Sequence, residues 1–331
     1  RAGGAGAGGR GRGRLSPAAA MSMIDARAER PGALPRLVVF GEALTDMVRT
    51  GADSWRSIAG GACWNVARVA ATLGVRTGWG GAVSDDLFGR EIVARSHEAG
   101  LDPRFLQVVA KAPLIAMVHA LDPPDYFFLG NDSADLAFDP SRLPEGWERA
   151  CGFAHFGCIS LVRQPLGARL VAIAEALHAS GVPVSFDPNC RNLMDAGYPP
   201  LFERMAALAT VVKMSDEDLR HVYPGLAVED ALARVRSLAP DATLLYTRGA
   251  RGMTAYRGGD RVEQPAFKVA VADTVGAGDA CIGGYLASLL QDPHADLAVH
   301  VRFAAATAAA ACTLSGAHAP PRAEVETLLP P

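Results

Sequence analysis

The chain has 331 residues, of which 50% are hydrophobic and 20% are charged. That much apolar sequence can bury one large core, with or without a smaller second one, and excludes a disordered protein. The formal net charge of -3 gives no overall attraction to nucleic acid or anionic lipid, so we expect neither nucleic acid nor a membrane as partner.

The cysteines and the apolar runs indicate where such a protein works. The six cysteines have neither CxxC spacing nor the density of a disulfide scaffold, which favours reduced thiols and a cytoplasmic location. No uninterrupted apolar run reaches the roughly 18 to 20 residues that cross a bilayer. We therefore expect a soluble, cytoplasmic protein that acts on a small molecule.

The beginning of the chain has low complexity. Residues 1–20 consist mainly of Gly, Ala and Arg, a composition that cannot build a core. We predict a disordered leader over 1–33, either an artificial or mistranslated upstream segment or a flexible tail, with Met21 or Met23 as the natural start. The folded domain is expected over 34–331.

From there the sequence alternates short apolar strands with longer helical stretches. The expected strands are 36–44, 77–83, 153–158, 183–188, 209–215 and 243–249, and the expected helices are 61–74, 88–100, 166–181 and two that start at 277 and near 296. This alternation predicts an α/β fold with three layers, in which helices flank both faces of a mostly parallel sheet. Ligands of such sheets bind at the carboxyl ends of the strands.

One stretch departs from the alternation. Residues 112–130 contain two strand-like runs on either side of a turn at 122–125, which predicts a β-hairpin. Together with the irregular segment 46–59, this hairpin is expected to form a small β-sheet lid over the site. The lid segments are thus predicted near 46–59 and 111–135.

A glycine-rich turn in VADTVGAGDACIGGYLASLL, residues 271–290, carries the strongest chemical signal. Gly276, Ala277 and Gly278 lead into an apolar helix, so their backbone N–H groups and the helix dipole can hold an anion. The spacing alone is also compatible with an ordinary helix start, in which the dipole favours Asp279. A phosphoryl-transfer site, however, needs both an anion nest and a carboxylate that accepts a proton from the attacking hydroxyl.

These residues resemble a known family. DTVGAGDACIGGYLASLL is similar to the carboxy-terminal signature of the ribokinase-like (PfkB) carbohydrate kinases, and AGGACWNVARVAATLG at 59–74 is similar to their amino-terminal signature. The likeness extends over about 36–320 and implies a β-sheet lid and ATP-dependent phosphorylation of a sugar or nucleoside hydroxyl. By this resemblance Asp279 is the general base, and Gly276, Ala277 and Gly278 form the anion hole.

The resemblance also implies a set of sugar contacts. Asp46 follows the first strand, where the family delivers a polar residue to the sugar. Gly60, Gly61 and Asn65 stand at the start of a helix, and polyols need fixed polar groups and close backbone approach. Alternatively, the two glycines only make a turn and Asn65 lies on an exposed face. Arg163 completes the predicted substrate-binding residues.

Nucleotide contacts are expected at the ends of later strands. The segment YTRGARG at 246–252 is similar to the family's nucleotide segment. The residues predicted to bind nucleotide are Asn189, Thr247, Gly249, Gly252 and Thr274. No GxxxxGK[ST] motif occurs in the sequence, which agrees with a kinase that is not of the P-loop type.

The acidic residues predicted to bind metal have two interpretations. In VKMSDEDLR at 212–220, Asp218 and, behind it, Glu217 are predicted to organise Mg²⁺ indirectly, as the family's Asn-x-x-Glu motif does. Ser215 with Asp218 also approaches a capping box, which explains the same residues structurally. ATP and Mg²⁺ are the expected cofactors, and a monovalent cation such as K⁺, required by part of the family, is left open.

The choice of sugar rests on less specific segments. YFFLGNDSADLAF at 126–138 is most similar to bacterial fructokinases, although Leu129 and Gly130 replace their Tyr-Arg pair. A 2-keto-3-deoxygluconate kinase would need a cation for the substrate carboxylate, which Arg163 or Arg191 would supply. Fructose is the first prediction, with 2-keto-3-deoxygluconate or ribose as alternatives.

Two further hypotheses concern other classes of partner. A sugar or nucleotide sensor on the same fold would bind without releasing ADP, and an intact Asp279 argues against it. An exposed edge of the lid could also pair between subunits, which would make a homodimer.

Overall fold

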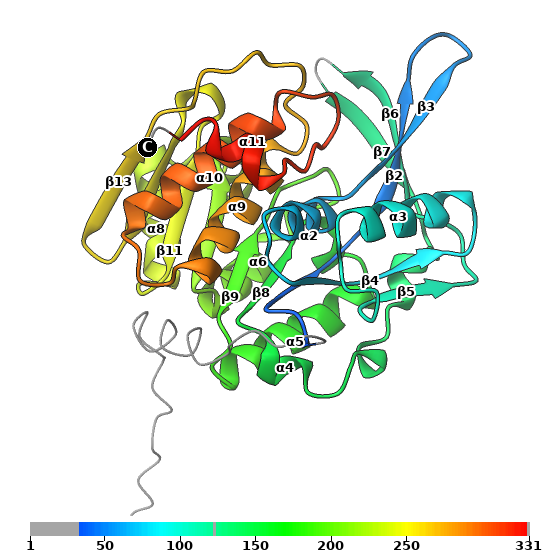
Figure 1. Cartoon of the computed structure of the whole chain (residues 1–331), viewed down its shortest axis with the longest axis horizontal. Helices are drawn as coiled ribbons and strands as arrows, with labels where there is room; N and C mark the ends of the chain where they lie inside the picture. Colours follow the sequence, from blue (N-terminus) through cyan, green and yellow to red (C-terminus); the bar gives the residue numbers. More distant parts are fainter. Residues whose placement is uncertain (1–32, 122–123, 330–331) are drawn as a thin grey trace, which may run out of the picture.

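The computed structural model describes residues 33–121 and 124–329, with a large sheet and a small sheet (Figure 1). The large sheet has the strand order β13-β12-β11-β10-β9-β8-β1-β4-β5. Its strands are β1 (Leu37–Phe40), β4 (Thr77–Ser84), β5 (Leu106–Val109), β8 (Phe153–Gly157), β9 (Val184–Asp187), β10 (Val211–Ser215), β11 (Thr243–Thr247), β12 (Met253–Arg257) and β13 (Asp260–Gln264). In this sheet only the pairs β11–β12 and β12–β13 are antiparallel, so the predicted three-layer, mostly parallel α/β fold is confirmed.

Helices cover both faces of the large sheet. They are α2 (Ala62–Thr72), α3 (Leu87–Glu98), α4 (Trp147–Ala150), α5 (Leu166–Ala179), α6 (Pro199–Leu208), α7 (Asp216–Val222), α8 (Val228–Leu238), α9 (Ala277–Gln291), α10 (Leu297–Ala311) and α11 (Arg322–Glu326). Helices α2, α9 and α10 pack side by side on one face (Figure 1). No helix among the described residues is long and apolar enough to cross a membrane.

The alternation of side chains along β1 explains why there are two apolar layers. Val38 and Phe40 point into the core under α5, α6 and α8, whereas Leu37 and Val39 point into the core under α2, α9 and α10. All four side chains are fully buried, as expected for a central parallel strand that is covered on both faces. The rigid centre of the sheet therefore fixes where the strand ends lie.

The small sheet has the order β3-β2-β6-β7 and corresponds to the predicted lid. Its strands are β2 (Leu44–Arg49), β3 (Trp55–Gly60), β6 (Ile115–Leu121) and β7 (Pro124–Leu129). The expected hairpin is β6 and β7, although residues 122 and 123 of its turn lie outside the described residues. It projects from the large sheet at the upper right of Figure 1.

Two details of the predicted elements were wrong in this region. The expected strand 36–44 ends at Phe40, because Gly41 has a φ of 145° and a Cβ there would lie 2.4 Å from Cys63 Sγ. The segment 46–59, expected to be irregular, forms most of β2 and β3. The chain therefore leaves the core sheet and enters the lid within a few residues.

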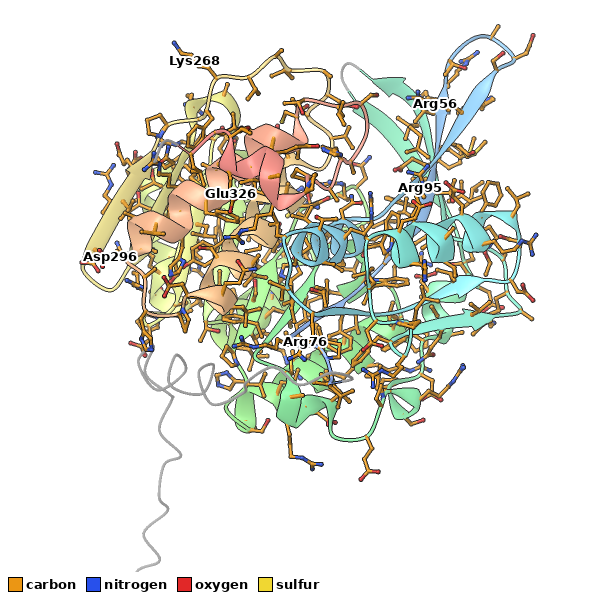
Figure 2. The ribbon with its side chains drawn as sticks, in the orientation of Figure 1. Arg56, Arg76, Arg95, Lys268, Asp296 and Glu326 are labelled. Atoms are coloured by element: carbon orange, nitrogen blue, oxygen red, sulfur yellow. The ribbon has the colours of Figure 1, made fainter. Side chains whose placement is uncertain are left out.

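The outside of the molecule carries the charged side chains. Figure 2 labels Arg56 on β3, Lys268 in the loop before α9 and Asp296 just before α10, all of which are exposed. The predicted leader over 1–33 falls almost wholly on residues 1–32, which lie outside the described residues.

Candidate active site

The candidate site lies where the first turn of α9 meets the carboxyl ends of the central strands. Asp279 is in that first turn and is only 7% exposed. Asn65 Nδ2, from α2, donates to Asp279 Oδ2 at 2.9 Å, and Asn189 Nδ2, after β9, donates to Oδ1 at 3.4 Å. The structure therefore brings together three residues that are 90 or more positions apart, and Asn65 is not on an exposed face.

The environment of Asp279 shifts its protonation. Burial raises the pKa of Asp279 to about 6, against the lowering effects of the Asn65 hydrogen bond and of Lys213 and Arg191. Desolvation disfavours the charged form of a carboxyl group, so this sign is expected. Asp279 thus changes its charge just below neutral pH, in the range where a proton acceptor is useful.

The glycine turn before Asp279 has the geometry of a nest. Gly276 has a φ of 77° in the left-handed region and precedes the first residue of α9. The amide of Ala277 donates to Thr274 O at 3.2 Å, so in this structure one of the three predicted anion-hole amides is already used inside the turn. Gly278, the second residue of α9, lines the cavity described below.

A second carboxylate faces the same region from the lid. Asp46 lies on β2, and burial raises its pKa to about 6, with Arg191 lowering it and Asp279 raising it. A Cβ on Gly60 would lie 2.5 Å from Asp46 Oδ2, and one on Gly61, at a φ of 116°, would lie 2.7 Å from Glu42 O. Both glycines are therefore needed to make room, and Asp46 and Asp279 are close enough to repel each other.

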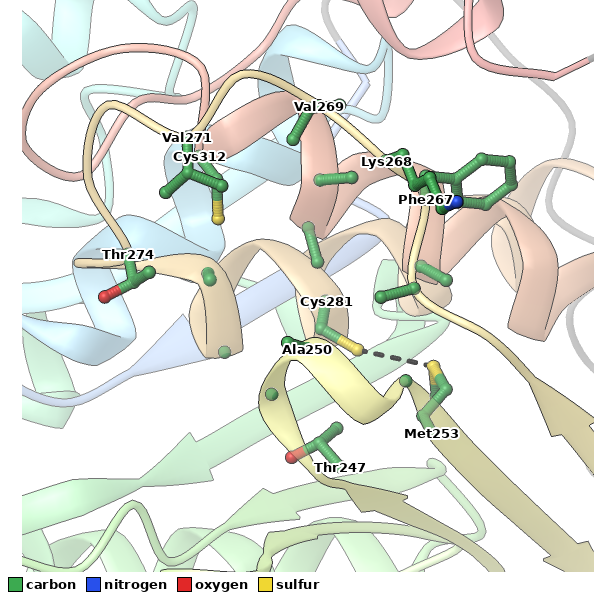
Figure 3. A pocket seen from close by; sticks show the side chains of 18 residues that line it. Thr247, Ala250, Met253, Phe267, Lys268, Val269, Val271, Thr274, Cys281 and Cys312 are labelled. Carbon is green, nitrogen blue, oxygen red and sulfur yellow. Dashed lines mark hydrogen bonds between the residues drawn. The ribbon is translucent and has the colours of Figure 1, made fainter.

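A cavity of about 580 Å³ opens on the other side of the glycine turn (Figure 3). Thr247, Gly249, Gly252 and Thr274, four of the five residues predicted to bind nucleotide, line it together with Ala277 and Gly278. Helix α10 contributes small side chains, among them Ala305, Ala308 and Ala309. Figure 3 shows Cys281 of α9 on the wall of the cavity, with its Sγ 3.8 Å from Met253 Sδ. The volume and the apolar lining are typical of a small-molecule site.

Arg163, predicted to contact the substrate, is engaged by neighbouring groups of the protein. Its Nε donates to Asp135 Oδ2 at 2.8 Å, and its Nη2 donates to Gly130 O and to Ser133 Oγ at 2.7 Å each. The guanidinium is 11% exposed and its partner carboxylate 3%. Arg163 therefore holds the segment 130–135 against the core, and its contact with a sugar stays a prediction.

Asp218 forms the capping box that the sequence had left as one of two interpretations. Its Oδ2 accepts from Ser215 N at 2.8 Å and Ser215 Oγ at 2.7 Å, and its Oδ1 accepts from Cys190 N at 2.7 Å. Glu217 is exposed. In the described part of the chain, no group of three His, Cys, Asp or Glu side chains could hold a metal ion.

Two buried charged residues near the site, Glu42 and Lys213, were missed by the sequence analysis, and Arg191, which it named only as a possible partner of a substrate carboxylate, lies beside them. Glu42, just after β1, accepts a hydrogen bond from Ala62 N at 3.2 Å and another from Ser160 Oγ. Burial raises the pKa of Glu42. Arg191 interacts electrostatically with both Asp46 and Asp279, and Lys213 lies under the glycine turn. The signal that was available is a charged residue inside or directly after an apolar strand, because such a residue is buried only when it is paired.

Comparison with known proteins gives this geometry a family. The chain matches the description "pfkB family carbohydrate kinase" over residues 34–324. The chain belongs to the pfkB family of carbohydrate kinases. It is therefore a phosphotransferase that acts on a sugar hydroxyl, as the resemblance of its two signatures had implied.

Several members of this family are similar over nearly the whole length. A fructokinase of Klebsiella pneumoniae is 32% identical over 85% of this chain and 94% of that protein. The aminoimidazole riboside kinase of Salmonella enterica, solved with its riboside and an ATP analog, is 30% identical, with a TM-score of 0.78 over 89% of this chain and 99% of that one. A fructokinase of Vibrio cholerae O395, solved with fructose, ADP and a calcium ion, is 27% identical, with a TM-score of 0.80 over 90% and 99%.

Asp279 should lower the stability of this pfkB kinase at neutral pH. The folded pKa of about 6 lies above the ordinary 3.8, so the folded state binds the proton more tightly, and stability falls as pH rises from 4 to above 6. We expect Asp279→Asn to raise the free energy of unfolding by up to about 3 kcal/mol at pH 8 and by little at pH 4. Urea unfolding at both pH values measures this, with the exposed Asp260→Asn as control, and equal effects at both pH values would contradict it.

Proposed function

We propose that this kinase transfers the γ-phosphoryl group of ATP to a hydroxyl of fructose. The single observation that carries this proposal is the buried Asp279 carboxylate, which stands between the lid residue Asp46 on one side and the cavity on the other. A proton acceptor is useful at this point only when a hydroxyl reaches it from one side and a phosphate from the other.

The residues of the chain act mainly by positioning. Asp46 and Asn65 orient the sugar, and Gly60 and Gly61 let it approach the backbone. Asp279 accepts the proton of the attacking hydroxyl on a carboxylate oxygen. The amide of Gly278 and the positive end of the α9 dipole stabilise the charge on the transferred group. Because the transition state is largely dissociative, positioning and charge stabilisation outweigh the strength of the base.

Nucleotide and metal are expected in the cavity and at its inner end. Its volume of about 580 Å³ and its wall of glycines and alanines suit a nucleotide, with Thr247, Gly249, Gly252 and Thr274 in contact and Asn189 near the phosphates. Mg²⁺ would neutralise phosphate charge when bound. The donor set fits indirect binding, because hydrogen bonds occupy both oxygens of Asp218 and Glu217 would act through water. A role for K⁺ stays a prediction.

Fructose is favoured over an anionic sugar by the position of the cations. Arg163, one of two candidates for a substrate carboxylate, is committed to Asp135, and Arg191 already faces the carboxylates Asp46 and Asp279. A neutral sugar therefore fits better than 2-keto-3-deoxygluconate. The aminoimidazole riboside kinase among the relatives supports a neutral riboside as the second candidate.

An assay of ADP release with Mg·ATP tests the substrate. We expect the highest kcat/KM with fructose and lower values with ribose, tagatose, adenosine, aminoimidazole riboside and 2-keto-3-deoxygluconate. A preference for 2-keto-3-deoxygluconate would overturn the argument from Arg163. Saturable sugar binding without ADP release from any of the six would indicate a sensor.

Replacing Asp279 tests the mechanism. Asp279→Asn should lower kcat by about 10² to 10⁴ while leaving the Kd of ATP nearly unchanged, because the base acts only on the hydroxyl. In the native enzyme kcat/KM should fall as pH drops below about 6, where Asp279 takes up a proton. Stopped assays from pH 5 to 8, with Asp260→Asn as control, measure both effects. Turnover near the native value in Asp279→Asn would remove this residue from the mechanism.

We also propose a homodimer that forms through the lid. The small sheet has β3 and β7 as its edges, and Trp55, Phe127 and Leu129 on these strands are 39%, 52% and 49% exposed. Exposed apolar side chains on a sheet with open edges favour pairing between chains. We expect Phe127→Asp to convert a dimer into a monomer in light scattering, and a native monomer at micromolar concentration would refute the proposal.

A cytoplasmic location is the last part of the proposal. All six cysteines lie in the described residues and are free thiols, and the cytosol keeps thiols reduced. Disulfides detected by mass spectrometry in protein isolated with its thiols blocked would argue against this location.

A further inference from the structure

Lys213 is a charged residue in the middle of the core sheet. It lies on β10 between apolar neighbours, and its Nζ is 2.8 Å from Asp187 Oδ2 on the adjacent strand β9. Both side chains are 4% exposed. The ammonium and its partner are therefore buried inside the fold at the strand ends that face α9.

The ammonium reaches the glycine turn itself. A Cβ built on Gly278 would lie 3.2 Å from Lys213 Nζ and 3.7 Å from its Cε. The φ of Gly278 is not in the left-handed region, so backbone conformation does not require a glycine at this position. A side chain at 278 would make a tight contact with Lys213 Nζ and would displace the ammonium by a few tenths of an ångström. The charge thus lies directly against the first turn of α9.

Lys213 stays protonated in this environment. Burial alone would lower its pKa, but Asp187 and Asp218 outweigh that effect and raise the pKa above its ordinary value. Lys213 in turn lowers the pKa of Asp279. The other charged groups that face Asp279 are Arg191, which also lowers its pKa, and Glu42, Asp46 and Asp187, which raise it.

A buried ion pair is a weak device for stability. Replacing such a pair by well-packed neutral side chains is often neutral or stabilising, since both charges must lose their hydration. Packing of the sheet therefore does not account for an ammonium at this position. Its contact with the anion-binding turn provides another reason for it.

We propose that Lys213 is a positioning residue of the phosphoryl-transfer site, whose fixed positive charge acts through Gly278 and Asp279. This inference rests on the proposed function. From behind the turn, the ammonium favours negative charge on the amide side of Gly278, where the terminal phosphate of ATP would sit. It also favours the ionised form of Asp279 that can accept a proton. Asp187 holds the ammonium in this position.

The test replaces both charged members of the pair, and Asp218, the other carboxylate near Lys213, keeps its hydrogen bonds from Ser215 and Cys190. In Lys213→Met with Asp187→Asn we expect kcat to fall about 10- to 100-fold, which is at or below the lower end of the roughly 10²- to 10³-fold loss that follows removal of one donor to a developing anion. The acidic limb of the kcat/KM profile should move to higher pH, because Lys213 affects Asp279 more than Asp187 does. The preference for Mg·ATP over Mg·ADP, measured as Kd by calorimetry, should shrink by about tenfold.

Two more variants make the result decisive. Arg204→Met with Glu175→Gln removes a half-exposed ion pair of 2.6 Å between α6 and α5 and should change none of the three measurements. Lys213→Gln with Asp187→Asn keeps an amide pair and serves if the first double variant does not fold. A folded variant with native kcat, pH profile and ATP preference would overturn the proposal. If the native enzyme phosphorylates no sugar, the proposed function fails, while the nucleotide affinities still test Lys213.

Discussion

The hydrogen bond from Asn65 to Asp279 is the contact on which the site depends. It joins α2 to α9, and with Asn189 it places the carboxylate at the strand ends of the core sheet. Burying a carboxylate is costly, and the two amide donors only partly offset that cost. The raised pKa of Asp279 expresses this imbalance. The protein tolerates it because the same desolvation makes every other charge near the turn more effective.

The glycines around this carboxylate have different reasons to be glycines. Gly276 and Gly61 have backbone conformations that other residues rarely adopt. Gly60 leaves room for Asp46, and Gly278 leaves room for Lys213. In each case a missing side chain brings a charge or a backbone group close to the place where substrates are expected. Packing against charged side chains therefore explains some of these glycines, and freedom of the backbone explains the others.

Much of this arrangement could be predicted from the sequence. The alternation of apolar strands and helices identified the parallel sheet, and the spacing in DTVGAGD identified the nest with Asp279. Thr247, Gly249, Gly252 and Thr274 do line one cavity. The fold prediction is confirmed because it rests on local periodicity, which the sequence displays directly, whereas the roles of the site residues rest on the family resemblance and stay predictions. Asp218 had two local interpretations, and its capping box is the one that the structure contains.

The contacts that the sequence did not predict join residues that are far apart along the chain. Arg163 is 28 residues from Asp135, and Lys213 is 26 residues from Asp187, so no local sequence pattern predicts either ion pair. The break at Gly41 was missed because Ala43 and Leu44 resume an apolar pattern after Glu42. Whether that pattern stays in one sheet depends on Cys63, which lies behind Gly41 only after the fold has formed. Tertiary contacts of this kind override a local strand pattern.

The end of the first core strand just before Gly41 affects how strongly the enzyme would favour a sugar over water as acceptor. Because the chain crosses from the core sheet into the lid between Phe40 and Leu44, Asp46 lies on the small sheet, whereas Asp279 lies on α9, which packs on the large sheet. In the proposed mechanism the acceptor touches both parts, whereas a water molecule in its place would gain contacts from only one of them. An acceptor large enough to touch both would be held in line and water would not, which would disfavour hydrolysis of the nucleotide.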